Sequence, residues 1–169
     1  MEKLKARLKT ILIKAFAKYC VGCDGRCCRS VVVTLFDQER DSLLAIKRDI
    51  CTCNERGSIS DMDISNGCPF LRKDGCSLEN GQRPFDCVTF PCYPIVGRYG
   101  DLVAILVHNS CPRADDIAHD RELMGVVRSF WVIALEEDIE PEDLARWKGE
   151  GESDPWNKYF TGWKVSVSC

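Results

Sequence analysis

Two dense groups of cysteines are the residues of this chain whose spacing could support chemistry. The first group places four thiols within nine positions, at Cys20, Cys23, Cys27 and Cys28. The second group begins about forty residues later and consists of Cys68, Cys76, Cys87 and Cys92. Thiols at this density form disulfides, bind metal ions or act as redox catalysts.

The cellular compartment decides among these uses, and the N-terminal segment bears on the compartment. A secretory signal requires an unbroken apolar core of about 7–15 residues, but Lys14 interrupts the apolar stretch at residues 11–13. The chain has twelve cysteines. Disulfide frameworks occur mainly in short secreted chains, whereas a chain of 169 residues is long enough to build a core without them. We therefore expect a cytoplasmic protein whose clustered thiols bind metal.

A dithiol catalyst is a poorer interpretation of the first group. A thioredoxin-like C-x-x-C pair opens a helix, whose N-terminus lowers the thiol pKa. Here Cys20 and Cys23 follow a predicted amphipathic helix, because apolar residues recur at three- and four-residue steps over residues 3–18.

The spacing of the first group fits a metal-binding loop, in which one metal can bind both thiolates of a C-x-x-C turn. Gly22 and Gly25 permit the positive φ values that such a loop can require. Cys27 and Cys28 are neighbours, and adjacent side chains in extended chain point to opposite faces. One of them is expected to share a centre with Cys20 and Cys23, and the other to join a second centre or remain a buried thiol. The eight clustered cysteines could form two four-ligand sites, or one site plus structural thiols.

Four further residues stay open as ligands, namely Cys51, Cys53, His108 and Cys111. His108-x2-Cys111 has the spacing of metal ligands, whereas Cys169 is expected to be unliganded. No paired carboxylates, serine–histidine–aspartate set or phosphate-binding loop supports an independent catalytic site. The sequence leaves open whether the chain is an enzyme.

Local patterns predict the elements that must position these residues. After the first helix, β-branched residues predict a strand over residues 30–36, and Asp37 is placed to cap a helix that ends near residue 46. Residues 49–67 lack a helical stripe and predict an irregular loop. Residues 68–92 are interrupted by proline and glycine and predict little regular structure.

The rest of the chain predicts a β-hairpin over residues 94–107 and a long helix over residues 114–138. A short helix is expected over residues 141–147, followed by a tail that covers an edge of the domain.

The predicted fold class is α+β, a mainly helical small single domain with one β-hairpin and a loop-built, cysteine-rich metal core. The domain spans residues 1–169. Residues 1–19 form its N-terminal amphipathic helix, residues 20–111 its metal-binding core, and residues 112–169 its helical C-terminal part and tail.

Charge and hydropathy restrict the partners. The net charge of −3 gives no electrostatic support for a nucleic-acid partner. No run of about 18 apolar residues is present, so no transmembrane segment is expected. The first eighteen residues carry six basic groups against one acid, which fits a docked helix or a surface that binds a membrane or a partner.

Three cysteine blocks follow one another between residues 20 and 92. The first is C-x2-C-x3-C-C followed by a hydrophobic segment, the second contains CPFL (68–71) and DGCSL (74–78), and the third is RPFDC (83–87). In this order the chain resembles the YkgJ-type cysteine-cluster family, which is described as zinc- or iron-chelating.

The resemblance implies that the cysteines of these blocks bind metal. The chain departs from the family pattern at Leu78, where a tyrosine is often found, and at Cys92, which adds a sulfur after Phe90-Pro91. Flagellin lysine methylases have a similar cluster that is linked to an iron–sulfur centre. This chain has no glycine-rich loop for a methyl-donor cofactor, so methylase activity is not carried over.

We expect all eight cysteines of the two groups to be metal ligands. Thiolate-only sites select iron–sulfur clusters or zinc, and twelve cysteines against two histidines favour iron. The expected function is to hold a cluster, of the 4Fe–4S type, for electron transfer or as an accessory to a redox or maturation system with a protein partner. The alternative is a structural zinc module that mediates protein interactions.

Overall fold

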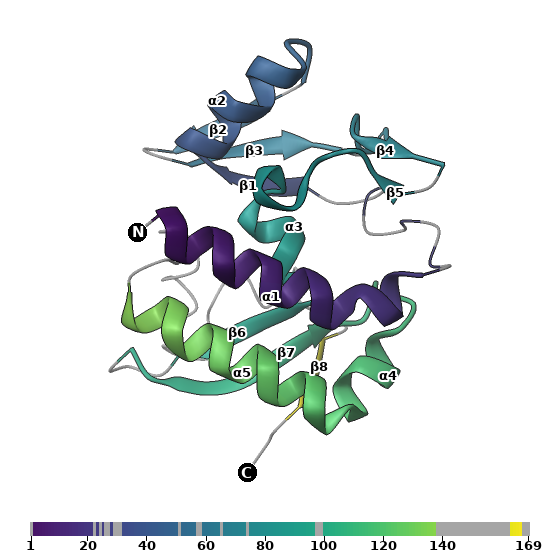
Figure 1. Cartoon of the computed structure of the whole chain (residues 1–169), viewed down its shortest axis with the longest axis vertical. Helices are drawn as coiled ribbons and strands as arrows, with labels where there is room; N and C mark the ends of the chain where they lie inside the picture. Colours follow the sequence, from purple (N-terminus) through teal and green to yellow (C-terminus); the bar gives the residue numbers. More distant parts are fainter. Residues whose placement is uncertain are drawn as a thin grey trace. The chain divides into compact units, whose positions relative to one another are not determined.

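The computed structural model describes residues 2–21, 23, 25, 28, 32–50, 52–56, 59–64, 66–73, 75–96, 100–137 and 163–166. The chain divides into two compact units, Met1–Thr89 and Phe90–Cys169. Helices and antiparallel strands occur in both units, so the α+β class is confirmed (Figure 1). The single domain over residues 1–169 stays a prediction.

The first unit begins with helix α1 (Glu2–Cys20), which confirms the helix predicted over residues 3–18. Its apolar stripe is buried: Leu8, Leu12 and Phe16 are 3%, 1% and 5% exposed. The helix packs against the 3-10 helix η2 (Asn80–Gln82) and helix α3 (Phe85–Thr89), which carries Cys87 (Figure 1). Burial of this stripe, rather than helix propensity alone, holds α1 in place.

A three-stranded antiparallel sheet follows, with β3 (Ile59–Asp63) between β1 (Val32–Phe36) and β2 (Thr52–Arg56). The irregular loop predicted over residues 49–67 is therefore wrong. Met62 and Ile64 are buried on either side of exposed Asp63, as expected for alternating strand residues. Pairing with two neighbouring strands outweighs the low strand propensity of the polar residues.

Helix α2 (Asp37–Ile46) has the predicted bounds, but Asp37 does not cap it. The cap residue is Phe36, whose backbone N–H donates to Glu39 Oε2 at 3.4 Å. Leu43 of α2 is fully buried. It belongs to a hydrophobic cluster whose other members come from the strands and the second cysteine region: Val33, Leu35, Ile50, Met62, Ile64, Phe70 and Leu78.

The second cysteine region is built from very short elements. A two-stranded ladder joins β4 (Leu71–Arg72) and β5 (Gly75–Cys76), and a 3-10 helix, η2 (Asn80–Gln82), precedes the one-turn helix α3 (Phe85–Thr89). Little regular structure was predicted here, and the proline and glycine residues do keep each element short.

The second unit contains the predicted hairpin, formed by β6 (Cys92–Val96) and β7 (Leu102–His108). A third strand, β8 (Trp163–Ser166), pairs with the other edge of β7. The described residues thus form three antiparallel sheets, where one hairpin was predicted, although helix still exceeds strand among them.

The long helix predicted over residues 114–138 is wrong, because it is two helices, α4 (Ala114–His119) and α5 (Arg121–Glu136). Asp120 has an extended backbone between them, and its Oδ1 accepts the N–H of Leu123 at 3.0 Å. That bond caps α5 and interrupts the chain of helical hydrogen bonds. The helix predicted over residues 141–147 lies outside the described residues.

None of the helices in the described part of the chain combines the length and the apolar composition of a membrane-spanning segment.

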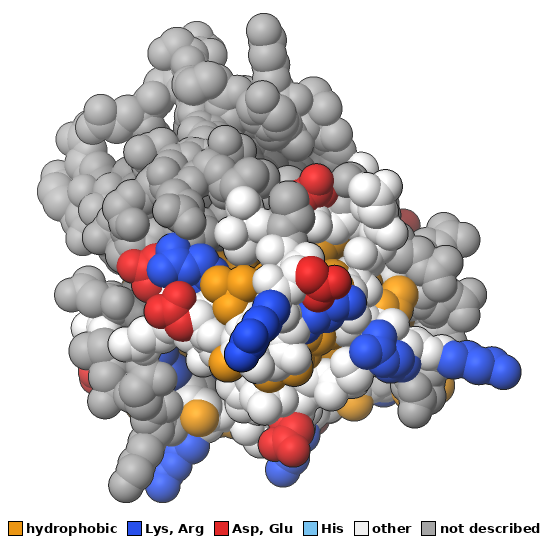
Figure 2. All heavy atoms as spheres, turned by 90° about the horizontal axis from the view of Figure 1, so that it is seen from above, with side chains coloured by type: hydrophobic (Ala, Val, Ile, Leu, Met, Phe, Trp, Pro, Cys, Tyr) orange, Lys and Arg blue, Asp and Glu red, His pale blue; other side chains and the backbone are white. Residues whose placement is uncertain are grey.

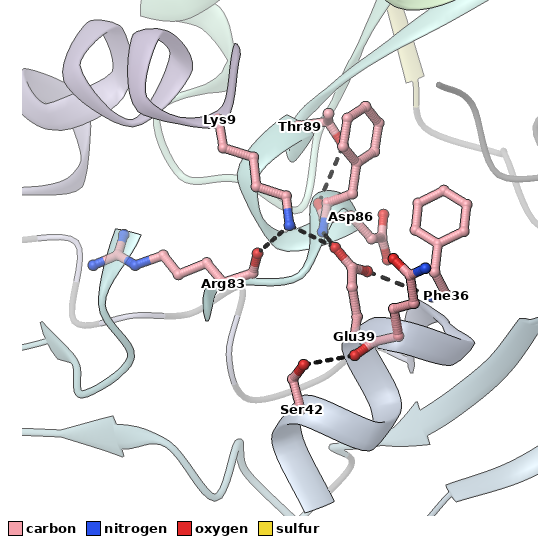
Figure 3. Close-up of polar contacts among 9 residues, drawn as sticks. Lys9, Phe36, Glu39, Ser42, Arg83, Asp86 and Thr89 are labelled. Atoms are coloured by element: carbon pink, nitrogen blue, oxygen red, sulfur yellow. Dashed lines mark hydrogen bonds and ion pairs between the residues drawn. The ribbon is translucent and has the colours of Figure 1, made fainter. Parts of the chain in front are cut away.

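A buried polar network ties the elements of the first unit together (Figure 3). Lys9 Nζ of α1 lies 2.6 Å from Glu39 Oε1 of α2 and donates to the carbonyl of Arg83 at 2.8 Å. The same Glu39 oxygen accepts the N–H of Phe85, the first residue of α3, at 2.8 Å. Its second oxygen accepts the N–H of Phe36. One carboxylate therefore fixes α1, α2 and α3.

Glu39→Gln should lower the free energy of unfolding by about 3 kcal/mol, because it leaves the Lys9 charge without its counter-ion at a largely buried site. The two side chains are 14% and 8% exposed. Urea unfolding measures the change. Asp41→Asn is the control, because Asp41 is 67% exposed in its ion pair with Arg40 and should change stability by less than about 1 kcal/mol. Equal effects of the two substitutions would contradict the assignment.

Candidate metal centre

The first cysteine group lies where α1 ends. Cys20 is the last residue of the helix and is exposed. Cys23 follows in a turn, where its N–H donates to the carbonyl of Cys20 at 3.3 Å, and the N–H of Cys28 donates to the carbonyl of Gly25 at 2.9 Å. Gly25 has φ +61°, the left-handed conformation that the sequence anticipated for this loop.

The position of Cys20 also bears on redox chemistry. A helix C-terminus carries the negative end of the helix dipole, which disfavours a thiolate. Cys20 and Cys23 therefore lack the helix N-terminus that activates thioredoxin-like pairs. This arrangement argues against a dithiol catalyst, as the sequence indicated.

The two cysteine groups meet at Cys28 and Cys68. The N–H of Cys68 donates to the carbonyl of Cys28 at 2.7 Å, so the two backbones are directly joined. Their side chains also interact, and this interaction is the largest cause of a lowered pKa of Cys68. The structure thus brings together one thiol from each group, across forty residues of sequence.

The surroundings of Cys68 favour its thiolate. The hydrogen bond from the Cys28 side chain, the backbone N–H groups of Phe70 and Leu71, and the charge of Arg72 lower the pKa of Cys68 to about 6, although its burial acts in the opposite direction. The thiolate is the form that binds metal. Cys68 is consequently ionised at neutral pH and suited to be a ligand.

Packing holds the first loop against the second region. A Cβ atom on Gly25 would lie 2.8 Å from Leu71 Cδ1, so the glycine permits a close approach of the loop to β4. Leu71 pairs across the β4–β5 ladder with Cys76. Cys68 and Cys76 both pack against the hydrophobic cluster of this unit. Two predicted ligands therefore pack against one hydrophobic cluster, and Cys28 contacts the first of them, Cys68.

Cys87 is the last cysteine of the second group within the first unit, and it is exposed on α3. The residues before it are firmly held, since Asp86 Oδ2 accepts the N–H of Thr34 of β1 at 3.0 Å and Phe85 donates to Glu39. The block RPFDC (83–87) is thus anchored on α1 and α2 (Figure 3) and also on β1, while its cysteine is exposed.

Cys92 lies in the second unit and has a different environment. It is 1% exposed, and its carbonyl accepts the N–H of Trp131 Nε1 at 3.1 Å. Burial, with a contribution from Cys111, raises the pKa of the Cys92 thiol far above its usual range. The thiol is therefore protonated at neutral pH, and its role as a ligand stays a prediction.

His108 ends β7, as expected, and its Nδ1 contacts Ser110 Oγ at 2.6 Å. Burial lowers the pKa of His108, so the neutral ring is favoured. Cys111 is partly buried three residues later. Both stay open as ligands.

Some predicted positions cannot be placed. Cys27, Cys51 and Cys169 lie outside the described residues, as does the side chain of Cys53 in β2. In the portion of the chain that is described, no three Cys, His, Asp or Glu side chains form a group that could hold a metal ion. The pair Cys28–Cys68 is the part of the predicted site that the structure assembles.

No family model, curated protein or solved structure matches this chain. The similarity to the YkgJ-type family consequently rests on the cysteine blocks of residues 20–92, and membership stays a prediction. The contributions of Arg72 and of the backbone N–H groups of Phe70 and Leu71 were not predicted. The only sequence signal for them is their position directly after Cys68.

In the metal-free protein, alkylation of Cys68 by iodoacetamide should rise with a midpoint near pH 6, because only the thiolate reacts. In concentrated urea the midpoint should return to about 8.5. Trypsin releases Cys68 within residues 57–72, which contain no other cysteine, so mass spectrometry can follow it alone.

Cys28→Ala removes the largest cause of the lowered pKa and should move this midpoint upward. The folded-state pKa lies below the unfolded one, so the thiolate of Cys68 stabilises the fold at high pH. This stabilisation should decline as the pH falls from about 8.5 towards 6. An unchanged midpoint in Cys28→Ala would refute the pairing of the two thiols.

Gly25→Ala should destabilise the first unit by roughly 1–2 kcal/mol, because alanine is strained at φ +61°. The added methyl group would also displace the Leu71 side chain. Gly81→Ala is the matched control, since nothing lies within 4 Å of its added Cβ and its φ is not positive. Urea unfolding of both variants provides the test, and equal stabilities would contradict the proposed packing.

Proposed function

We propose that this protein holds an iron–sulfur cluster, of the 4Fe–4S type, through thiolates of its two cysteine groups. The observation that carries the proposal is the contact of Cys28 with Cys68. It joins the two groups and leaves one thiol ionised at neutral pH. A cluster bound between Cys28 and Cys68 would replace the interaction of their thiols and would be held by both sulfurs.

Backbone N–H groups near a ligand sulfur are a recognised means of tuning a cluster. Those of Phe70 and Leu71 point to the sulfur of Cys68, and the charge of Arg72 lies nearby. Such groups stabilise negative charge on the sulfur and raise the reduction potential of a bound cluster. The site is thus suited to electron transfer as well as to metal binding.

A cluster of this type requires four thiolates. Cys28 and Cys68 supply two, and Cys76 is the next candidate because it packs against the same hydrophobic cluster as Cys68. The other predicted ligands are Cys20, Cys23, Cys27, Cys87 and Cys92. Cys92 is the weakest of these, since burial keeps its thiol protonated at neutral pH.

The proposed role is electron transfer, or service to a redox or maturation system in the cytoplasm. The competing proposal is a closed zinc site on the same thiolates, which would stabilise the fold without redox activity. Thiolate ligands suit both metals. The near absence of histidine favours the cluster, and the two proposals differ in colour, sulfide content and redox response.

Anaerobic purification should give a brown protein with about four iron and four sulfide ions per chain. Cys28→Ala and Cys68→Ala should each lose most of this iron and the visible absorption. Cys169→Ala, at a cysteine expected to be unliganded, is the matched control. A colourless protein with stoichiometric zinc would replace the cluster by the zinc module. A protein that retains neither metal, or whose metal content is unaffected by both substitutions, would refute the proposed site.

A further inference from the structure

One face of α1 carries several basic side chains at its surface. Four residues at spacings of four, three and four lie on this face, which we call the basic face: Arg7, Ile11, Lys14 and Lys18. All four are exposed. They lie opposite the buried stripe of Leu8, Leu12 and Phe16, so the packing of the first unit leaves them accessible.

Arg7 and Lys14 of the basic face differ from the neighbouring cations of the same helix, since Lys18 lies over the ring of Tyr19 at 5.0 Å. Lys9 is buried in its ion pair with Glu39, and Lys5 lies over the ring of Phe36 at 5.0 Å. By contrast, Arg7 and Lys14 make no ion pair or hydrogen bond with any described side chain. Their charges are therefore available to an external partner.

The surface around α2 provides a contrast, because its charges are compensated. Arg40 pairs with Asp37 at 3.0 Å and with Asp41 at 3.2 Å. Figure 2 shows basic and acidic side chains close together around hydrophobic ones on the face that it displays. Single-sign charge on an exposed helix face is what steers an oppositely charged molecule.

The basic face also offers an apolar contact. Ile11 is 49% exposed and lines an open depression together with Ala6, Arg7 and Thr10. Weak, transient redox complexes have small interfaces, and complementary charges steer their association. The face therefore fits a partner that binds briefly and releases.

Position links this face to the proposed cluster. Lys18 lies two residues before Cys20, at the end of the helix from which the first cysteine group continues. We propose that the basic face docks an acidic protein electron carrier, of the ferredoxin or flavodoxin class, beside the cysteine loop. This inference rests on the proposed function. With a cluster held by Cys28, Cys68 and further thiolates, one electron would pass to it from the reduced carrier, so that the carrier would be oxidised and the cluster reduced.

A membrane fits the same charges less well. An amphipathic helix binds a bilayer by burying its apolar face among the lipids. The apolar face of α1 is already buried in the protein, where Leu12 is 1% exposed, and Ile11 is the one large apolar side chain of the basic face. Charge complementarity with an acidic protein is the interaction that remains.

The test uses the full chain and, as probe, a 2Fe–2S ferredoxin with a strongly acidic surface. Binding should be measurable at about 0.02 M salt and weaken at least tenfold at about 0.2 M, where charges are screened over a shorter distance. The double variant Arg7→Glu/Lys14→Glu should weaken low-salt binding by about tenfold or more. Arg48→Glu/Arg121→Glu is the matched control, because it makes the same change of net charge at exposed residues elsewhere.

Equal loss of binding in both double variants would overturn the proposal, since net charge alone would then explain it. So would failure of the ferredoxin to bind at low salt, or binding to phosphatidylserine vesicles without binding to the ferredoxin. Binding is measured without reference to cluster content, which is followed separately by absorption. A colourless protein that still binds through the basic face would refute the cluster and leave the docking surface standing.

Discussion

The carboxylate of Glu39 is the contact on which the first unit depends. It receives the Lys9 ammonium from α1, the N–H of Phe36 at the start of its own helix, and the N–H of Phe85 from α3. A buried carboxylate is stable only when such partners surround it. Because α1 ends at Cys20 and α3 carries Cys87, the position of both cysteines follows from this single group.

The chemistry of the cysteines depends on their environment more than on their number. Cys68 lies among hydrogen-bond donors and near a cation, whereas Cys92 lies among apolar groups and beside another thiol. Hydrogen bonding and opposite charge favour an ionised sulfur, and desolvation opposes it. Two residues of the same type in one sequence region therefore differ in protonation at neutral pH, and only Cys68 is in the thiolate form, which is the form that binds metals.

Sequence periodicity predicted the elements whose partners are local. Helices α1 and α2 and the β6–β7 hairpin were found close to their predicted bounds. Strands β2 and β3 were missed because their stability comes from pairing, of β3 with β1 earlier in the chain and of β2 with β3, and not from their own polar residues. The break at Asp120 was missed because one side-chain cap interrupts an otherwise continuous apolar stripe.

The spacing of the cysteines identified both groups, but it did not predict that Cys28 and Cys68 meet. That contact is made by the folding of the forty residues between them.

That contact also closes the chain on itself. The segment between Cys28 and Cys68 contains β1, α2, β2 and β3 and is a loop of forty residues whose ends are joined by one backbone hydrogen bond. A metal that bridges the two sulfurs would act as a cross-link, or clasp, that closes this loop. By the chain-entropy relation for cross-links, such a clasp lowers the conformational entropy of the unfolded chain and so stabilises the fold by about 4 kcal/mol. Because this quantity varies only with the logarithm of loop length, the sheet could gain or lose residues in its turns with little effect on the clasp.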